Sequence, residues 1–401
     1  MTMITTEPNT ETTLAQGKNY LAQTYARAPF VITHGEGMTV WDSTGKSYLD
    51  FVAGIAVMAL GHSDPGVVQV MQEQAATLMH VSNLYYTPPQ IQLAVQLCEA
   101  SFADKVFFCN SGAEANEACI KFARKYARAN GHQDKTEIIG FSHAFHGRTI
   151  GVLSVTPKPQ YQDAFQPLMP GVHILPYNDI EAAQAAIGPH TCAVMIEPIQ
   201  GEGGIHAATP KFLQTLRDLC DQYDALLIFD EVQCGLGRTG DLWAHTASGV
   251  TPDLMSLAKP LAAGLPIGAA LMTDKVNAAL APGDHGSTFA GGSVVCAVAS
   301  YALSRINTPE MLGHVQETGE YLMERLAELN SPHILDVRGR GLMIGMELDF
   351  PAAEVIQAGY DAGFLLVNAG PNVIRFVPPL IVEKQHIDAL ITFLSSFLAS
   401  K

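Results

Sequence analysis

The feature of this chain that most limits its fold is a series of short apolar segments, each followed by polar turn residues and then by a helical pattern. The segments are KVFFC, TEIIGF, VHILP, CAVMIEP, ALLIFDEV and LMSLA, between residues 105 and 258. Strands and helices that alternate at this spacing form a mostly parallel α/β sheet with helices on both faces. Because ligands of such sheets bind at the carboxyl ends of the strands, the residues after each segment are candidates for function.

The segments outside this region predict a second, smaller α+β domain. Residues 37–51, GMTVWDSTGKSYLDF, alternate apolar and polar side chains around a turn at 43–46 and indicate a β-hairpin. After residue 295 come two helical patterns, a strand pair in HILDVRGRGLMIGMELDF, a helix, the strand VIRFVPP and a last amphipathic helix. We therefore expect an N-terminal arm and hairpin over residues 1–60, a large cofactor-binding domain over 61–295, and a small domain over 296–401 that includes the hairpin.

Charge and composition exclude several classes of partner. The chain carries a formal net charge of -16, so we expect no binding to nucleic acid, which requires basic surface. No apolar run approaches the length that spans a bilayer, and we expect no membrane association. The first 16 residues lack both an apolar core and any arginine, which is unlike a secretory or transit signal. Seven scattered cysteines without a CxxC pair favour free thiols, so we predict a cytoplasmic protein.

The first candidate site follows KVFFC, where the chain continues as NSGAEANEACIKFARKYA. Ser111, Gly112 and Ala113 are small and stand directly before a helical pattern. Small residues let a ligand approach the backbone, and the free N–H groups at a helix N-terminus bind phosphate. The alternative is an ordinary helix cap formed by Asn110 or Ser111.

The segment ALLIFDEVQCGLGRTG admits three interpretations. Its strand ends in Asp230-Glu231 like the acidic strand of a phosphate-transferring NTPase, but the only GKS in the chain, residues 45–47, lacks the first glycine of that motif. Residues 235–240 match GxGxxG, the dinucleotide motif of many oxidoreductases, but DEVQC separates them from the strand. The third interpretation pairs Asp230 with Lys259.

Lys259 lies in MSLAKPLAAGLPIGA and is the only ionisable side chain between Asp253 and Asp274. Apolar flanks lower the pKa of a lysine and favour its neutral, nucleophilic form. Chemistry with pyridoxal phosphate requires such a lysine for the Schiff base, a carboxylate against the ring nitrogen, and a phosphate-binding loop. Asp230 would supply the carboxylate, and a non-catalytic protein of the same fold would be expected to have lost one of these two residues.

Two further segments carry polar side chains at predicted strand ends. GFSHAFHGRTIG supplies Phe145 as a flat apolar surface and Arg148 as a carboxylate-binding fork. Its two histidines have no third ligand at a useful spacing, so we expect no metal site. DHGSTFAGG contains Ser287-Thr288, a hydroxyl pair that suits either an anion or a polar turn.

These residues resemble the class III, fold-type I, pyridoxal phosphate-dependent aminotransferases. The resemblance covers nearly the whole chain and is most specific in SGAEA, FHGRT, EPIQGEGG, DEVQCGLGRTG, LAKPLAAGLPIGA and GSTF, which occur in this order. Two other segments, GIAVMALGH and SNLYYTPPQIQLA, are most similar to members that act on N-acetylornithine. The resemblance implies an α/β fold of type I, with a mostly parallel central sheet, helices on both faces and a smaller α+β domain from the terminal segments.

The resemblance also implies how pyridoxal 5'-phosphate is held. Ser111, Gly112 and Ala113 are expected at the phosphate, together with Thr288 of the partner subunit. A homodimer with shared active sites is therefore implied. AGGSVVC departs from the usual family pattern and leaves the shape of the loop around Thr288 open.

The ring itself is expected to lie between Phe145 and Val232. Asp230 is expected to face the ring nitrogen and Gln233 the ring hydroxyl oxygen. Lys259 is expected to form the Schiff base and then to act as the catalytic base.

The substrate residues follow from geometry together with the resemblance. A donor of the ornithine type reacts through its distal amine and holds its α-carboxylate far from the ring, whereas glutamate reacts at its α-carbon and holds its α-carboxylate close. By resemblance, Arg148 would bind the first carboxylate and Arg375 the second, with Glu202 masking Arg375 while the donor is bound. Without the family, an ion pair at the surface or between domains is the alternative for both arginines. Ser287 and Tyr25 are weaker substrate candidates.

The function implied is transfer of the distal amino group of N-acetylornithine to 2-oxoglutarate, giving N-acetylglutamate 5-semialdehyde and glutamate in arginine biosynthesis. Succinylornithine, ornithine and 4-aminobutyrate remain alternative donors. Ile55 stands where ornithine aminotransferases tend to carry tyrosine, which favours an acylated donor.

Overall fold

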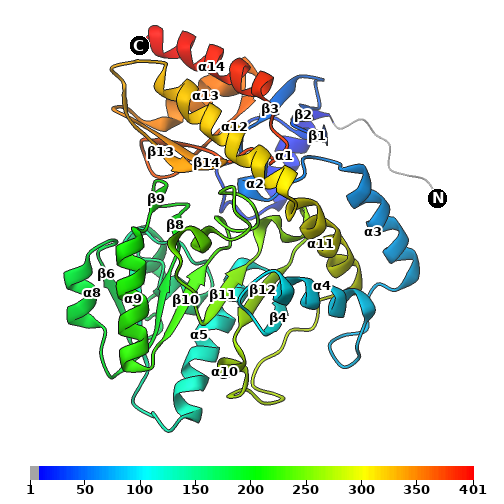
Figure 1. Ribbon diagram of the computed structural model, residues 1–401. Helices are drawn as coiled ribbons and strands as arrows, with labels where there is room; N and C mark the ends of the chain where they lie inside the picture. Colours follow the sequence, from blue (N-terminus) through cyan, green and yellow to red (C-terminus); the bar gives the residue numbers. More distant parts are fainter. Residues whose placement is uncertain (1–8) are drawn as a thin grey trace.

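The structure of the protein is a computed structural model that describes residues 9–401. Its centre is a seven-stranded sheet in the lower half of Figure 1. In their order across the sheet, the strands are β4 (Lys105–Cys109), β12 (Gly268–Met272), β11 (Leu254–Leu257), β10 (Leu226–Asp230), β7 (Thr191–Ile196), β5 (Glu137–Phe141) and β6 (Val172–Leu175). Six of them match the apolar segments from which the sheet was predicted.

The strand that the sequence did not predict is β12, which runs antiparallel to both of its neighbours, β4 and β11. The other pairings between adjacent strands are parallel. Its residues continue the apolar stretch that flanks Lys259, so periodicity did not separate the strand from its surroundings. The predicted fold class, a mostly parallel α/β sheet, is confirmed.

Helices cover both faces of this sheet, which is why β7, β10 and β11 are buried along their whole length. One face packs against α5 (Gly112–Ala129), α6 (Ile150–Ser154) and α10 (Asp274–Asn277). The helices of the opposite side are α4 (Pro88–Glu99), α8 (Ile180–Ala186), α9 (Pro210–Tyr223) and α11 (Ser293–Ile306), with α3 (Pro65–Thr77) against α11. This arrangement leaves the strand ends as the place where polar side chains meet.

Two smaller sheets lie above the central one in Figure 1. The first contains β13 (Ile334–Arg340), β14 (Met343–Leu348), β17 (Val373–Phe376) and β16 (Val367–Asn368). The second contains β1 (Ile32–Glu36), β2 (Thr39–Asp42), β3 (Ser47–Asp50) and β15 (Phe364–Leu365). The helices that pack on them are α12 (Pro309–Ala327), α13 (Ala352–Ala362) and α14 (Lys384–Ala399).

The parallel pairing of β3 with β15 joins the N-terminal hairpin to the C-terminal segment. It supports placing the hairpin in the small domain, and the boundaries at residues 60 and 295 stay a prediction. Residues 1–8 of the predicted N-terminal arm lie outside the described part of the chain. The remainder forms α1 (Thr10–Tyr20), a helix that the sequence pattern did not indicate and that buries none of its residues.

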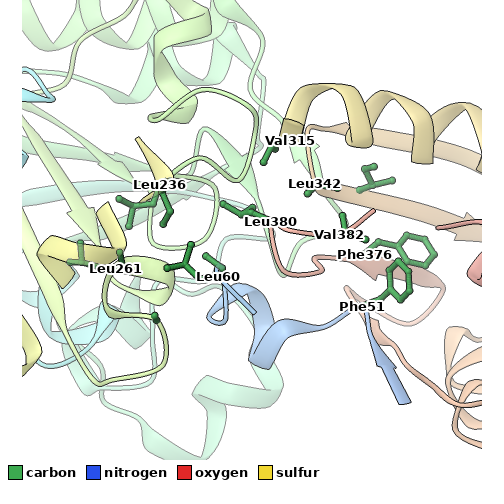
Figure 2. Close-up of a cluster of buried hydrophobic side chains, with 14 of the residues drawn as sticks. Phe51, Leu60, Leu236, Leu261, Val315, Leu342, Phe376, Leu380 and Val382 are labelled. Carbon is green, nitrogen blue, oxygen red and sulfur yellow. The ribbon is translucent and has the colours of Figure 1, made fainter. Parts of the chain in front are cut away.

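One continuous apolar core links the two regions. It extends from Leu236 and Leu261, beside the central sheet, through Leu60 and Leu380 to Phe51 and Phe376 of the smaller sheets (Figure 2). Because side chains from both regions interlock, the central sheet and the smaller sheets pack together as one body. The remaining short elements are α2 (Ala53–Ala56), α7 (Pro159–Gln162), β8 (Ile199–Gln200), β9 (His206–Ala207) and the 3₁₀ helices Asp163–Phe165, Ala244–Ser248 and Lys259–Ala262.

Within residues 9–401, none of the helices is both long enough and apolar enough to cross a membrane. The seven cysteines all lie in this part of the chain as free thiols, and six of them are buried.

Candidate active site

A cavity of about 280 Å³ lies at the carboxyl ends of the central strands. Nine of the fourteen residues that line it were predicted as site residues from the sequence. The lining residues are Gly112, Ala113, Asn116, Phe145, His146, Gly147, Arg148, Glu197, Glu202, Asp230, Val232, Gln233, Ala258 and Lys259. Residues far apart in the chain therefore meet where the topology of the sheet predicts a ligand.

The phosphate-binding candidates form the start of α5. Ser111 is the N-cap, and its side chain accepts a hydrogen bond from the backbone N–H of Glu114. A Cβ atom at Gly112 would lie 2.8 Å from Val232 Cγ1, so only glycine lets the helix start this close to Val232. The capping alternative and the phosphate-binding interpretation are both compatible with this geometry, because a cap satisfies only some of the N–H groups at the helix start.

Asp230 ends β10 and is buried, and neighbouring side chains fix its carboxylate. Asn116 Nδ2 and His146 Nδ1 each lie 2.7 Å from Asp230 Oδ2, while the Val232 N–H donates to Oδ1 at 3.0 Å. Burial by itself would lower the pKa of His146, but the hydrogen bond and charge of Asp230 outweigh it and raise that pKa. Hydrogen bonds to Asn116, His146 and Val232 thus hold the Asp230 carboxylate in one orientation. A metal-binding role for His146 is unnecessary because Asp230 accounts for its position.

Lys259 follows β11, the strand next to β10 in the sheet. Burial lowers the pKa of its amine, although the nearby carboxylates of Glu202 and Asp230 act in the opposite direction. Lys259 begins a short 3₁₀ helix, although a residue that precedes proline disfavours helical backbone angles. The lowered pKa favours the neutral amine that attacks a carbonyl group.

Phe145 and Val232 line the cavity from separate loops, and a buried carboxylate fixes the first of these loops. Glu197 accepts a hydrogen bond from the Phe145 N–H at 3.0 Å and another from the Gly201 N–H at 3.1 Å. Burial raises the pKa of the Glu197 carboxyl to about 7, while the charge of His146 acts in the opposite direction. Glu197 therefore ties the Phe145 loop to the loop that carries Glu202.

The two arginine candidates have different environments. Arg375 on β17 is buried, and its Nη1 lies 2.5 Å from Glu202 Oε1. Burial by itself would raise the pKa of Glu202, but the charges of Arg375 and Lys259 lower it. Arg148 is exposed, and its guanidinium carbon lies 3.4 Å from the centre of the Tyr161 ring. The site thus contains one paired cation and one exposed cation.

Five predicted residues are not among those that line the cavity. Ser111 and Arg375 border it, through the N-cap before Gly112 and through contacts with Glu202 and Gln233, whereas Ser287, Thr288 and Tyr25 lie elsewhere. Ser287 accepts a hydrogen bond from Asn110 Nδ2 at 2.9 Å, and Thr288 next to it is exposed. Tyr25 is 73% exposed and lies beside Arg27. Thr288 was assigned to the partner subunit's site, and a single chain leaves that assignment a prediction. Ser287 and Tyr25 are not among the residues that line this chain's own cavity.

The sequence pattern did not identify Asn116 or Glu197 as site residues and did not relate His146 to Asp230. Asn116 lies one helical turn after Gly112, but its hydrogen bond to Asp230 spans 114 residues. Glu197 carried a usable signal, since a carboxylate directly follows β7, a strand that is buried throughout. The GxGxxG match at residues 235–240 forms turns and opens no helix, so it lacks the geometry of a dinucleotide site.

The cavity fits pyridoxal phosphate. The helix start at Gly112 can hold the phosphate, the fixed carboxylate of Asp230 can face a ring nitrogen, and Lys259 can bond to the aldehyde carbon. Gly112 also lets the start of α5 lie directly against Val232, which lines the same cavity.

Comparisons with known proteins agree with this geometry. The family model for aminotransferase class-III matches residues 20–398. The chain is 51% identical over 379 residues to an acetylornithine aminotransferase of Methanocaldococcus jannaschii, covering 94% of this chain and 95% of that protein. It is 48% identical over 380 residues to a succinylornithine transaminase of Yersinia pseudotuberculosis, covering 92% of each. A structure of the ornithine aminotransferase from Toxoplasma gondii, with pyridoxal phosphate at partial occupancy in its active site, matches 98% of this chain and 94% of that chain with a TM-score of 0.94 and 32% identity.

Fold, cavity and comparisons together define an enzyme that uses pyridoxal phosphate, as the motifs predicted. The sequence match extends over both the central sheet and the smaller sheets. The protein belongs to the class III aminotransferases.

Proposed function

We propose that this aminotransferase moves the distal amino group of N-acetylornithine to 2-oxoglutarate, with N-acetylglutamate 5-semialdehyde and glutamate as products, as a step of arginine biosynthesis. The observation that carries the proposal is the contrast between the two arginines of the site. Arg148 is exposed at the cavity, whereas Arg375 is buried and paired with Glu202.

This contrast suits a donor that reacts through its distal amine. The α-carboxylate of such a donor lies far from the reacting carbon and can bind the exposed Arg148. Glu202 keeps the charge of Arg375 neutralised at that stage, so the inner end of the cavity accepts the uncharged part of the donor. When glutamate or 2-oxoglutarate binds, its α-carboxylate takes the place of Glu202 on Arg375. One cavity can therefore accept two substrates of opposite orientation.

Bound pyridoxal phosphate supplies an electron-withdrawing ring that stabilises negative charge at the carbon next to the reacting nitrogen. Asp230 would face the ring nitrogen and keep it protonated, with Asn116 and His146 holding the carboxylate in place. Phe145 and Val232 would flank the two faces of the ring. Gln233 would face the ring hydroxyl oxygen, and Ser111, Gly112 and Ala113 would bind the phosphate.

Lys259 would hold the cofactor through its amine, and the same amine would serve as the base that moves the proton at the reacting carbon of the donor. Its lowered pKa supports this role because the neutral amine can accept a proton at neutral pH.

The enzyme is proposed to act as a homodimer in the cytoplasm, with Thr288 of the partner subunit at the phosphate. A group of exposed large apolar side chains beside Ser287 supports a partner surface here. Its members are Leu84, Tyr85, Tyr86 and Phe289. Asn83 joins the two segments by donating to the carbonyl oxygens of Ser287 and Ala290. The free cysteines support a reducing compartment.

A donor panel and a labelling experiment test the proposal. The purified enzyme is given N-acetylornithine, succinylornithine, ornithine or 4-aminobutyrate with 2-oxoglutarate, and glutamate formation is followed. We expect the highest kcat/KM with N-acetylornithine. A higher value with another donor would contradict the proposal and identify that donor as the preferred substrate. Borohydride treatment is expected to abolish the visible absorption band and to leave a pyridoxyl group on Lys259 in a peptide map. A protein that binds no pyridoxal phosphate would contradict the mechanism.

A further inference from the structure

Arg375 contacts a second predicted site residue besides Glu202. Its Nη1 lies 2.9 Å from Gln233 Oε1 and also donates to the carbonyl oxygen of Gly201 at 2.9 Å. Arg375 is 1% exposed and Gln233 is 5% exposed, so water does not compete for this contact. The contact joins positions that are 142 residues apart in the chain.

The contact determines which end of the Gln233 amide faces the cavity. A guanidinium group only donates hydrogen bonds, so the oxygen of the amide must point towards Arg375 and the nitrogen must point away from it. Gln233 lines the cavity, and no acceptor in residues 9–401 bonds to its Nε2. Gly201 makes room for this amide, because a Cβ atom there would lie 2.3 Å from Gln233 Oε1.

We propose that Arg375 is a positioning residue for Gln233, holding the amide so that its N–H group donates to the ring hydroxyl oxygen of the cofactor. The inference rests on the role given to Gln233 in the proposed function and adds a second role for Arg375. A cation bound to the amide oxygen also polarises the amide and strengthens its N–H as a donor. Arg375 thereby affects the ring even when no substrate is present.

A further consequence concerns the change of substrates. The same Nη1 serves Gly201, Glu202 and Gln233, so a substrate carboxylate that displaces Glu202 alters the hydrogen bonding of the nitrogen that fixes Gln233. Binding of glutamate at Arg375 is therefore communicated to the ring oxygen through a single contact.

The test is a double-mutant cycle on the substrate-free holoenzyme, with the visible absorption of the bound cofactor measured against pH. A donor to the ring oxygen stabilises its anionic form, so its loss raises the pH at the midpoint of the spectral change. We expect Gln233→Met and Arg375→Met each to raise this midpoint by about one pH unit. The double variant is expected to match Gln233→Met alone, because Arg375 acts through Gln233.

Arg148→Met is the matched control, since Arg148 is a cation at the same cavity without a hydrogen bond to Gln233. We expect Arg148→Met to change the midpoint by the same amount in the wild type and in the Gln233→Met variant. If the two shifts of the main cycle add in full, Arg375 acts by charge alone and the proposal is overturned. Should Arg375→Met fold poorly, judged by its melting temperature, the whole cycle is measured in a Glu202→Gln background, which removes the carboxylate that Arg375→Met leaves unpaired. Because no substrate is present, absence of acetylornithine turnover would refute the proposed function and leave this result intact.

Discussion

Arg375 Nη1 lies 2.5 Å from Glu202 Oε1, so the carboxylate of Glu202 neutralises the buried guanidinium. A substrate carboxylate must therefore compete with Glu202 for Arg375. A substrate that does not bind Arg375 keeps the ion pair between Arg375 and Glu202 intact. Removing one partner of a buried ion pair leaves the other charge uncompensated.

Glu202→Ala is expected to affect the two half-reactions differently. Without Glu202, Arg375 stays charged and unpaired while N-acetylornithine is bound, so kcat/KM of the donor half-reaction should fall about tenfold. The glutamate half-reaction should be unchanged or faster, because its carboxylate no longer displaces Glu202. The two half-reactions are measured separately by mixing the enzyme rapidly with one substrate at a time and recording the absorption of the cofactor. Equal losses in both would argue against the masking role.

Arg148→Met is expected to lower kcat/KM for N-acetylornithine about 100-fold, because a charge-assisted hydrogen bond to the donor carboxylate is lost. N-acetylputrescine, which has the same distal amine but no α-carboxylate, should be affected far less. The ratio of the two kcat/KM values is the measurement. If both donors lose activity by the same factor, Arg148 acts on the fold or the cofactor and does not bind the carboxylate.

Much of the site could be predicted because its residues lie at the ends of apolar strands. Asp230 and Lys259 can be recognised in the sequence because each is an ionisable residue at the end of a run of buried apolar side chains. Contacts that join distant elements could not be predicted. The hydrogen bonds from Asn116 to Asp230 and from Arg375 to Gln233 depend on how α5 and β17 pack against β10, and no local pattern encodes that packing.

The limits of the fold prediction have a similar cause. β12 was missed because it lies within one uninterrupted apolar stretch, where a change from loop to strand leaves no periodic signal. The pairing of β3 with β15 joins segments at opposite ends of the chain, and the hairpin pattern alone did not identify this neighbour. The role of Thr288 depends on a second subunit, which the order of elements in one chain does not describe.

Gly112→Ala is expected to weaken cofactor binding about tenfold or more, because the added Cβ would lie 2.8 Å from Val232 Cγ1 and push the start of α5 off its position. Spectroscopic titration of the apoenzyme with pyridoxal phosphate measures the effect. Gly188→Ala is the matched control, since a Cβ atom there meets nothing within 4 Å. Adding Val232→Ala to Gly112→Ala should restore part of the affinity. If the affinity for pyridoxal phosphate does not recover, the contact between the added Cβ atom and Val232 is not the cause of the weaker binding.

Glu197 should make the stability of the apoenzyme depend on pH. Burial raises the pKa of its carboxyl to about 7, so this group contributes its full stability below its unfolded pKa, near 4.5, and loses it as the pH rises through 7. Glu197→Gln does not titrate, although its amide offers only one oxygen to the two N–H groups that the carboxylate accepts from. Whatever the stability difference from the wild type at pH 5, it should therefore shift in favour of the variant by pH 8, by on the order of 1 to 3 kcal/mol. Melting temperatures of the two apoenzymes across this range test the prediction. A difference that stays constant with pH would mean that Glu197 remains ionised throughout, held by the N–H groups of Phe145 and Gly201 and by the charge of His146.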